Sequence, residues 1–324
     1  MKKYFNYSLL LIIILIAVIF YGIEIRKHKI FPYEYLKKVY LYLNLDTRGL
    51  WSIGIYEGTT PFNLSNPENF FNPVLTEKDV DDIDARFVAD PFMLLKNGKY
   101  FMFFEVMNRQ TGQGDIGYAE SADGRKWKYR KIIIDEDFHL SYPYVFEWDN
   151  NYYLIPESTK DLSVRLYKAI SFPEKWEYVG NLLTGVHYAD SSLFRYKDKW
   201  WMFVSTGKGD LNLYYSNHLL TGWMPHPMNP IIKLNKHISR PGGRVFVYND
   251  ELYRLTQDDD PSYGIQVFAF LITKLSENQY AEKMASQTPI VTKTGSGWNA
   301  AGMHNVDPLK VGSKWISAVD GRNK

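Results

Sequence analysis

The feature that most constrains the fold is a unit of two short strands that returns five times, about every 50 residues. Each copy opens at a polar or proline-containing turn and closes on a polar residue after a run of aromatic and aliphatic residues. The copies span residues 89–105, 142–157, 189–205, 240–257 and 306–320. A repeat of this length that contains several strands is typical of a β-propeller blade.

A tight turn separates the two strands of each copy. The turns are Lys96-Asn97-Gly98-Lys99, Trp148-Asp149-Asn150-Asn151, Lys197-Asp198-Lys199, Asn249-Asp250-Glu251 and Gly312-Ser313-Lys314. Asn, Asp and Gly tolerate the positive φ angles of short hairpin turns, so each copy is predicted to be a β-hairpin. A second strand pair follows most copies, as at residues 115–119 and 127–129. Four strands per blade are therefore expected.

The predicted fold is all-β, a five-bladed β-propeller over residues 49–324, preceded by one N-terminal transmembrane helix. Residues 50–56 read as a strand, whereas the fifth copy is followed by too few residues for two further strands. We expect this first strand to complete the last blade and close the ring.

Residues 1–29 are predicted to form a membrane anchor with basic flanks, and residues 30–48 are predicted to form a linker. Tyr7 to Ile23 is almost wholly apolar, and Lys2, Lys3, Arg26, Lys27 and Lys29 flank it. About 17 residues at about 1.5 Å each are just enough to cross a hydrocarbon core of about 30 Å. A cleaved signal peptide is the alternative. Basic residues lie on both sides of the span, so the side of the membrane stays open.

Composition narrows the function classes. The net charge of +2 supplies no basic field, so no nucleic-acid partner is predicted. The absence of cysteine excludes disulfides and thiolate chemistry. No metal and no cofactor are predicted, because the acidic run at residues 79–84 lacks the spacing of a calcium loop and the histidines lack zinc-site spacing.

Propeller geometry predicts a candidate site. The first strand of each blade lines the central channel and the second runs back beside it, so the start of one and the end of the other meet at one mouth. This geometry brings one group of residues from each blade to the same mouth. The groups are Asp90 with Glu105, Tyr142 with Glu157, Asp190 with Ser205, Arg240 with Gln257 and Asp258, and His304 with Asp307. Carboxylates that face each other acquire different pKa values, so one can act as an acid and another as a base. The alternative for each acid is a cap of a turn or strand end.

Several motifs resemble the propeller domain at the N-terminus of plant glucosamine inositolphosphorylceramide transferases and of bacterial relatives. They include Ala89-Asp90-Pro91-Phe92, His139-Leu140-Ser141-Tyr142-Pro143-Tyr144-Val145, Ile155-Pro156-Glu157-Ser158 and Arg240-Pro241-Gly242-Gly243. More distantly, the blade pattern is similar to the five-bladed glycosidases of glycoside hydrolase families 43, 32 and 68.

The resemblance implies site roles. The glycosidase pattern implies a base or nucleophile at Asp90 and a supporting acid at Asp190, but its general acid in the fourth blade is replaced by Arg240. Glu157 is the predicted replacement and Glu105 the second candidate. We thus predict Asp90, Asp190 and Glu157 as catalytic residues, and Glu105, Tyr142, Arg240, Gln257, Asp258, His304 and Asp307 as substrate-binding residues.

The sequence therefore predicts a membrane-anchored, carbohydrate-active propeller that recognises a glycan or glycolipid head group through an acidic funnel. Whether it processes that ligand is open. In the plant proteins sugar transfer is attributed to a separate C-terminal domain, so a partner glycosyltransferase is expected. A non-catalytic glycan-binding module and a protein-interaction propeller are the alternatives.

Overall fold

The computed structural model describes residues 18–24, 27, 49–207 and 209–324. The predicted membrane span runs from Tyr7 to Ile23. Its residues 7–17 lie outside the described residues. Residues 18–24 are helical. Among the described residues, no helix combines the length and the apolar character that crossing a membrane requires.

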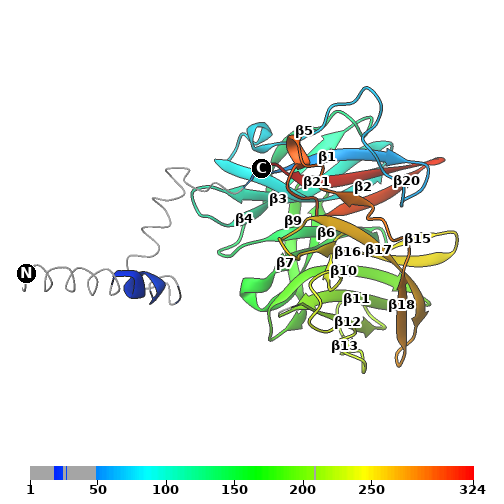
Figure 1. Ribbon diagram of the computed structural model, residues 1–324. Helices are drawn as coiled ribbons and strands as arrows, with labels where there is room; N and C mark the ends of the chain where they lie inside the picture. Colours follow the sequence, from blue (N-terminus) through cyan, green and yellow to red (C-terminus); the bar gives the residue numbers. More distant parts are fainter. Residues whose placement is uncertain (1–17, 25–26, 28–48, 208) are drawn as a thin grey trace, which may run out of the picture. The chain divides into compact units, whose positions relative to one another are not determined.

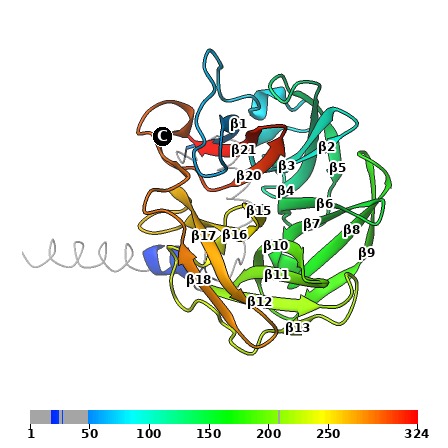
Figure 2. The ribbon, with the colours of Figure 1, turned by 90° about the vertical axis from the view of Figure 1, so that its right-hand side faces the viewer.

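The chain from residue 49 onward forms five antiparallel sheets, as predicted. Figure 2 shows these blades following one another around a common centre. The first blade is β2 (Ala85–Lys96), β3 (Lys99–Asn108), β4 (Gly114–Ser121) and β5 (Lys128–Ile134). The second is β6 (Ser141–Trp148), β7 (Asn151–Ser158), β8 (Ser163–Ser171) and β9 (Lys175–Thr184). The third is β10 (Tyr188–Tyr196), β11 (Lys199–Thr206), β12 (Asp210–Ser216) and β13 (Met224–Pro225).

The last two blades are less regular than the first three. The fourth contains β14 (Arg240–Pro241), β15 (Phe246–Tyr248), β16 (Glu251–Asp258), β17 (Gln266–Leu275), β18 (Tyr280–Met284) and β19 (Val291–Thr292). The fifth contains β20 (Val306–Val311), β21 (Lys314–Arg322) and β1 (Trp51–Gly58). Short 3-10 helices are η1 (Glu77–Asp79), η2 (Thr159–Asp161) and η3 (Gly297–Asn299). Figure 1 labels most of the strands.

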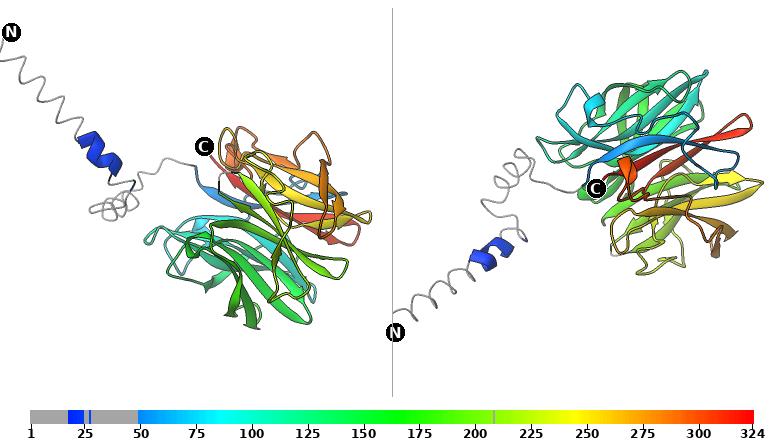
Figure 3. Two further views of the ribbon diagram at one scale, coloured as in Figure 1. Left: turned by 90° about the horizontal axis from the view of Figure 1, so that it is seen from below. Right: turned by 45° about the horizontal axis from the view of Figure 1, so that its top comes forward.

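The ring closes through its two ends, as the sequence predicted. β1 pairs antiparallel with β21 from Trp51 opposite Arg322 to Gly58 opposite Trp315. The right-hand view of Figure 3 shows these strands, blue and red, side by side. Among the described residues, the fourth strand position of this blade holds two isolated bridges, from Ser65 and Leu75 to β1.

The predicted hairpin turns owe their form to residues that accept positive φ. Asn97 and Gly98 have φ of 51° and 76°, and Asp149 and Asn150 have φ of 50° and 57°. Two consecutive residues with positive φ form the turn type whose twist matches that of paired strands. The turn composition thus fixes where each blade folds back.

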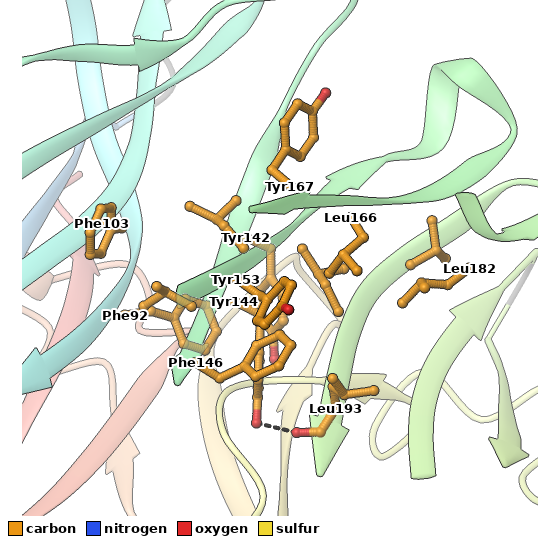
Figure 4. Close-up of a cluster of buried hydrophobic side chains, with 14 of the residues drawn as sticks. Phe92, Phe103, Tyr142, Tyr144, Phe146, Tyr153, Leu166, Tyr167, Leu182 and Leu193 are labelled. Atoms are coloured by element: carbon orange, nitrogen blue, oxygen red, sulfur yellow. Dashed lines mark hydrogen bonds between the residues drawn. The ribbon is translucent and has the colours of Figure 1, made fainter. Parts of the chain in front are cut away.

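Aromatic side chains fill the contacts between blades. Phe92 of the first blade packs edge-on against Tyr142 of the second, with ring centroids 4.8 Å apart. In the same cluster the Tyr144 hydroxyl donates a hydrogen bond to the Leu193 carbonyl of the third blade (Figure 4). Much of the high aromatic content therefore serves blade packing rather than ligand binding.

Candidate functional site

Three of the innermost strands carry the same irregularity at the mouth of the ring. The pairing register shifts between Ala89 and Phe92, between Ser141 and Tyr144, and between Ala189 and Ser192. The central residues Asp90, Tyr142 and Asp190 have φ of 53°, 45° and 53°, a region that non-glycine residues seldom adopt. Such β-bulges redirect side chains and are common beside active sites. Strained backbone of this kind costs about 1–3 kcal/mol per residue.

Asp90, His304 and Asp320 form a buried chain of contacts, here called the acid–histidine triad. His304 Nδ1 lies 2.6 Å from Asp320 Oδ2, and His304 Nε2 lies 3.5 Å from Asp90 Oδ1. Asp320 is fully buried and accepts hydrogen bonds from the backbone amides of Asp90, His304 and Asn305. Trp51 stacks on the imidazole ring, with centroids 4.0 Å apart. Backbone hydrogen bonds to Asp320 and the stacked indole ring therefore hold the triad in place.

Burial and charge set the protonation of the triad. Burial raises the pKa of Asp90, opposed chiefly by His304, and the result is a pKa of about 7. Burial alone would lower the pKa of His304, but the carboxylates of Asp320 and Asp90 outweigh it and raise this pKa to about 9. His304 is thus a cation at neutral pH, and Asp90 titrates near neutrality.

Arg240 binds two carboxylates from neighbouring blades. Its Nε donates a hydrogen bond of 2.6 Å to Asp190 Oδ2, and its Nη2 donates one of 3.3 Å to Glu157 Oε2. The Gln257 amide donates a further hydrogen bond of 2.8 Å to the same Asp190 oxygen. Burial and the nearby Asp190 raise the pKa of Glu157 well above its ordinary value, although Arg240 acts in the opposite direction. Burial thus favours the protonated form of Glu157, and the contact with Arg240 opposes this effect on its pKa.

Glu105 lies in the same buried region. Burial, with added repulsion from Asp90 and Glu157, raises the pKa of Glu105 well above its ordinary value. Its Oε1 lies 3.6 Å from His139 Nε2. His139 Nδ1 accepts a hydrogen bond from the Gly114 amide, which places a ring proton on Nε2, facing Glu105. The predicted acids thus converge, but beneath the surface.

A pocket of about 560 Å³ opens beside this buried group. Of the described residues that line it, Arg240 and Ser205 belong to the predicted mouth; the others include Lys236, Asp259 and Tyr263. Side-chain exposure is 25% for Arg240 but 8% or less for Asp190 and Glu157. The arrangement is a pocket whose wall presents a guanidinium group, with the carboxylates behind it.

Comparison with known proteins places the chain in a family. The model for "Glucosamine inositolphosphorylceramide transferase 1, N-terminal" matches residues 43–322. The chain belongs to this family. Glucosamine inositolphosphorylceramide transferase 1 of Oryza sativa subsp. japonica is 36% identical over 301 residues, and the Arabidopsis thaliana protein is 33% identical. The alignments cover 85% of this chain but only 40% and 39% of those proteins, so the chain spans well under half of their length.

Solved structures share the fold of this transferase N-terminal family at low sequence identity. A putative glycosidase from Bacteroides thetaiotaomicron has a TM-score of 0.62 at 14% identity, covering 81% of this chain and 97% of the other. A β-1,2-mannobiose phosphorylase from Listeria innocua has a TM-score of 0.59 at 14% identity, covering 83% and 96%. At such identities these likenesses establish the propeller fold alone.

Three residues predicted to bind substrate have protein partners in this family member. The Tyr142 hydroxyl lies 2.9 Å from the Ser192 hydroxyl and accepts a hydrogen bond from the Gly243 amide. Asp258 Oδ1 lies 2.9 Å from His237 Nδ1. Asp307 is fully buried and forms an ion pair of 2.7 Å with Arg244. None of these three is among the described residues that line the pocket.

The sequence reasoning missed Asp320 and Tyr263. Asp320 closes the second strand of the fifth hairpin, the position that Glu105 and Glu157 occupy in their blades, so the repeat itself carried the signal. Tyr263 lies in the loop between β16 and β17, with the Arg240 guanidinium 5.2 Å from its ring centroid. The strand pattern of the sequence gives no signal for a residue in such a loop.

Stability should fall as pH rises from 5 to 9. Asp90 and His304 both have raised pKa values, so the folded state binds protons more tightly than the unfolded chain between about 4 and 7 for Asp90 and between about 6.5 and 9 for His304. We expect the thermal unfolding midpoint to decrease across both windows. Asp90→Asn should reduce the slope of the acidic part of the profile, to which Glu105 and Glu157 also contribute, and His304→Gln should reduce the slope of the alkaline part. A midpoint that increases over this range would contradict the assignment.

Proposed function

We propose that this protein recognises a glycan or glycolipid head group in the pocket beside Arg240. The observation that carries the proposal is the arrangement of this arginine, which is fixed by Asp190 and Glu157 and still lines a pocket of about 560 Å³. That volume lies within the range of about 300–1,000 Å³ common to small-molecule sites. Relatives named for transfer to an inositolphosphorylceramide, and glycosidase-like fold neighbours, support a sugar-containing ligand.

The lining suits a sugar. Tyr263 is 38% exposed and offers a ring face for the CH groups of a pyranose. Ser205, Ser239 and Lys236 line the same pocket and can bond to hydroxyl or anionic groups. The guanidinium group has five donors, more than its two carboxylate bonds use. A head group that accepts hydrogen bonds would thus find a preorganised donor.

Catalysis is the second candidate, and the protonation states favour it. The raised pKa of Glu157 favours the protonated form that a general acid requires, while Asp90 has a pKa of about 7 and can accept a proton. In this reaction Glu157 would protonate the leaving oxygen of a glycosidic bond, and Asp90 would activate a water or attack the sugar carbon. The ligand would have to reach past Arg240, since both carboxyl groups are buried.

A glycan array and an aryl-glycoside panel applied to the full chain test both candidates. Recognition predicts that Tyr263→Ala weakens binding at least tenfold, whereas Tyr178→Ala, an exposed tyrosine outside the pocket, leaves binding unchanged. Catalysis predicts turnover that falls at least 100-fold in Glu157→Gln and Asp90→Asn. Binding without turnover would make the propeller a recognition module. Binding to no glycan would refute both candidates.

We further propose that residues 7–23 anchor the protein in a membrane, so that the propeller meets glycolipids or membrane-bound glycans. The support is the apolar run itself and its basic flanks. A partner glycosyltransferase would act on the ligand held here. Release of the full chain from membranes by salt and alkaline washing would refute the anchor.

A further inference from the structure

A second pocket lies at the other end of the strands from the mouth described above. It measures about 470 Å³, and Trp148, Tyr153, Arg195 and Trp200 are among the residues that line it. Trp148 ends β6, the strand that begins with Ser141 near the mouth. At about 3.3 Å per residue, an eight-residue strand separates its two ends by about 25 Å. One ligand ring cannot occupy both pockets.

The pocket contains an exposed aromatic surface in a fixed position. The Trp148 side chain is 37% exposed, and its ring meets the buried Trp200 edge-on at a centroid distance of 5.0 Å. The Arg195 guanidinium lies 4.6 Å from the Trp148 centroid and 5.8 Å from that of Trp200. Packing and cation–π attraction therefore hold the indole with little remaining rotamer freedom. A ligand that contacts it causes little further loss of side-chain entropy.

The lining indicates the class of ligand. Aromatic rings and Leu220 form apolar walls, while Asn217, His218 and Asp149 supply hydrogen-bonding groups. The positive charge of Arg195 and the negative charge of Asp149 offset each other, so the pocket favours a neutral ligand over an ionic one. A pyranose combines apolar CH faces with a rim of hydroxyl groups, and the volume matches that of a small-molecule site.

We propose that this aromatic pocket is a second binding site, for a neutral sugar ring. It is independent of the pocket at Arg240, because the two share no described residue and lie at opposite ends of the blades. A protein with both sites would hold two sugar units, or two separate chains, at once.

The test uses the full chain and a panel of neutral gluco-, manno-, galacto- and xylo-oligosaccharides, with binding followed by saturation-transfer NMR and calorimetry. Trp148→Ala should weaken binding of at least one oligosaccharide about tenfold or more, and Trp148→Phe should preserve most of it, because an aromatic face remains. The matched control is Tyr178→Ala. Tyr178 is 47% exposed with Arg165 4.8 Å from its ring centroid, the same environment outside the pocket.

A variant of the mouth separates this proposal from the proposed function. Residual binding in Arg240→Ala/Asp190→Asn that disappears when Trp148→Ala is added would establish the second site. Glycan binding that depends on Arg240 but is unchanged by Trp148→Ala would overturn the second site and leave the proposed function standing. Binding of none of the panel would also overturn it. Near-ultraviolet circular dichroism checks that each variant folds.

Discussion

Arg240→Ala should abolish glycan binding at the pocket beside Arg240 and lower the free energy of unfolding by about 3–5 kcal/mol. The guanidinium is the partner of Asp190, a carboxylate with only 2% exposure, and also contacts Glu157. Removing it leaves the buried Asp190 side chain without its arginine partner, although the Gln257 amide still donates a hydrogen bond to it. Binding should fail because the group that lines the pocket is gone. Calorimetry and urea denaturation measure the two effects separately.

A double variant distinguishes lost recognition from lost stability. Arg240→Ala/Asp190→Asn also replaces the buried carboxyl group that has lost its partner, so it should recover much of the stability, but it cannot recover the donor in the pocket. Arg240→Lys keeps the charge and loses the geometry that reaches two carboxylates, and should be intermediate in both measurements. If the double variant, measured with Trp148→Ala added to remove the second pocket, regains glycan binding, Arg240 is a structural residue and the proposed function fails.

Arg244→Ala should be the most damaging single change away from the pocket, with an expected loss of about 3–5 kcal/mol in the free energy of unfolding. Arg244 forms an ion pair of 2.7 Å with Asp307 and donates hydrogen bonds to the Val145 and Met93 carbonyls. Asp307 in turn accepts a hydrogen bond of 2.6 Å from the Met93 amide. This pair joins four blades at the centre of the ring.

The matched control for Arg244 is an ion pair on the surface. Arg125 lies 2.7 Å from Glu57, but its side chain is 44% exposed, so Arg125→Ala should cost about 1 kcal/mol or less. Arg244→Leu/Asp307→Leu, which removes both charges, should be more stable than Arg244→Ala alone. Equal urea midpoints for Arg244→Ala and Arg125→Ala would show that the central pair contributes little.

Much of the fold was predictable because it depends on short-range chemistry. Two hairpin turns contain residues that accept positive φ, Asn97 with Gly98 and Asp149 with Asn150. Both hairpins were predicted correctly from these turns. The closure by β1 followed from counting strands, since a propeller with an incomplete last blade needs a strand from the other terminus. Local composition and strand number carry this information without any knowledge of distant contacts.

The sequence was a poorer guide to which side chains contact each other across the ring. His304 was paired with Asp307 from sequence, but its ring lies between Asp320 and Asp90, whereas Asp307 pairs with Arg244. The two aspartates lie in the two strands of the same hairpin, Asp307 in β20 and Asp320 in β21. Strand alternation sends them toward different neighbours, and a one-residue difference in register reverses the face on which a side chain lies.

The sequence alone determined the five blades, their hairpin turns, the closing strand and the set of polar residues at the strand ends. Only the tertiary structure decided which of those residues are exposed. Asp90, Glu105, Glu157 and Asp190 are buried, whereas Arg240 lines the pocket. Burial and pKa depend on side chains contributed by several blades, and those contacts exist only once the ring has closed.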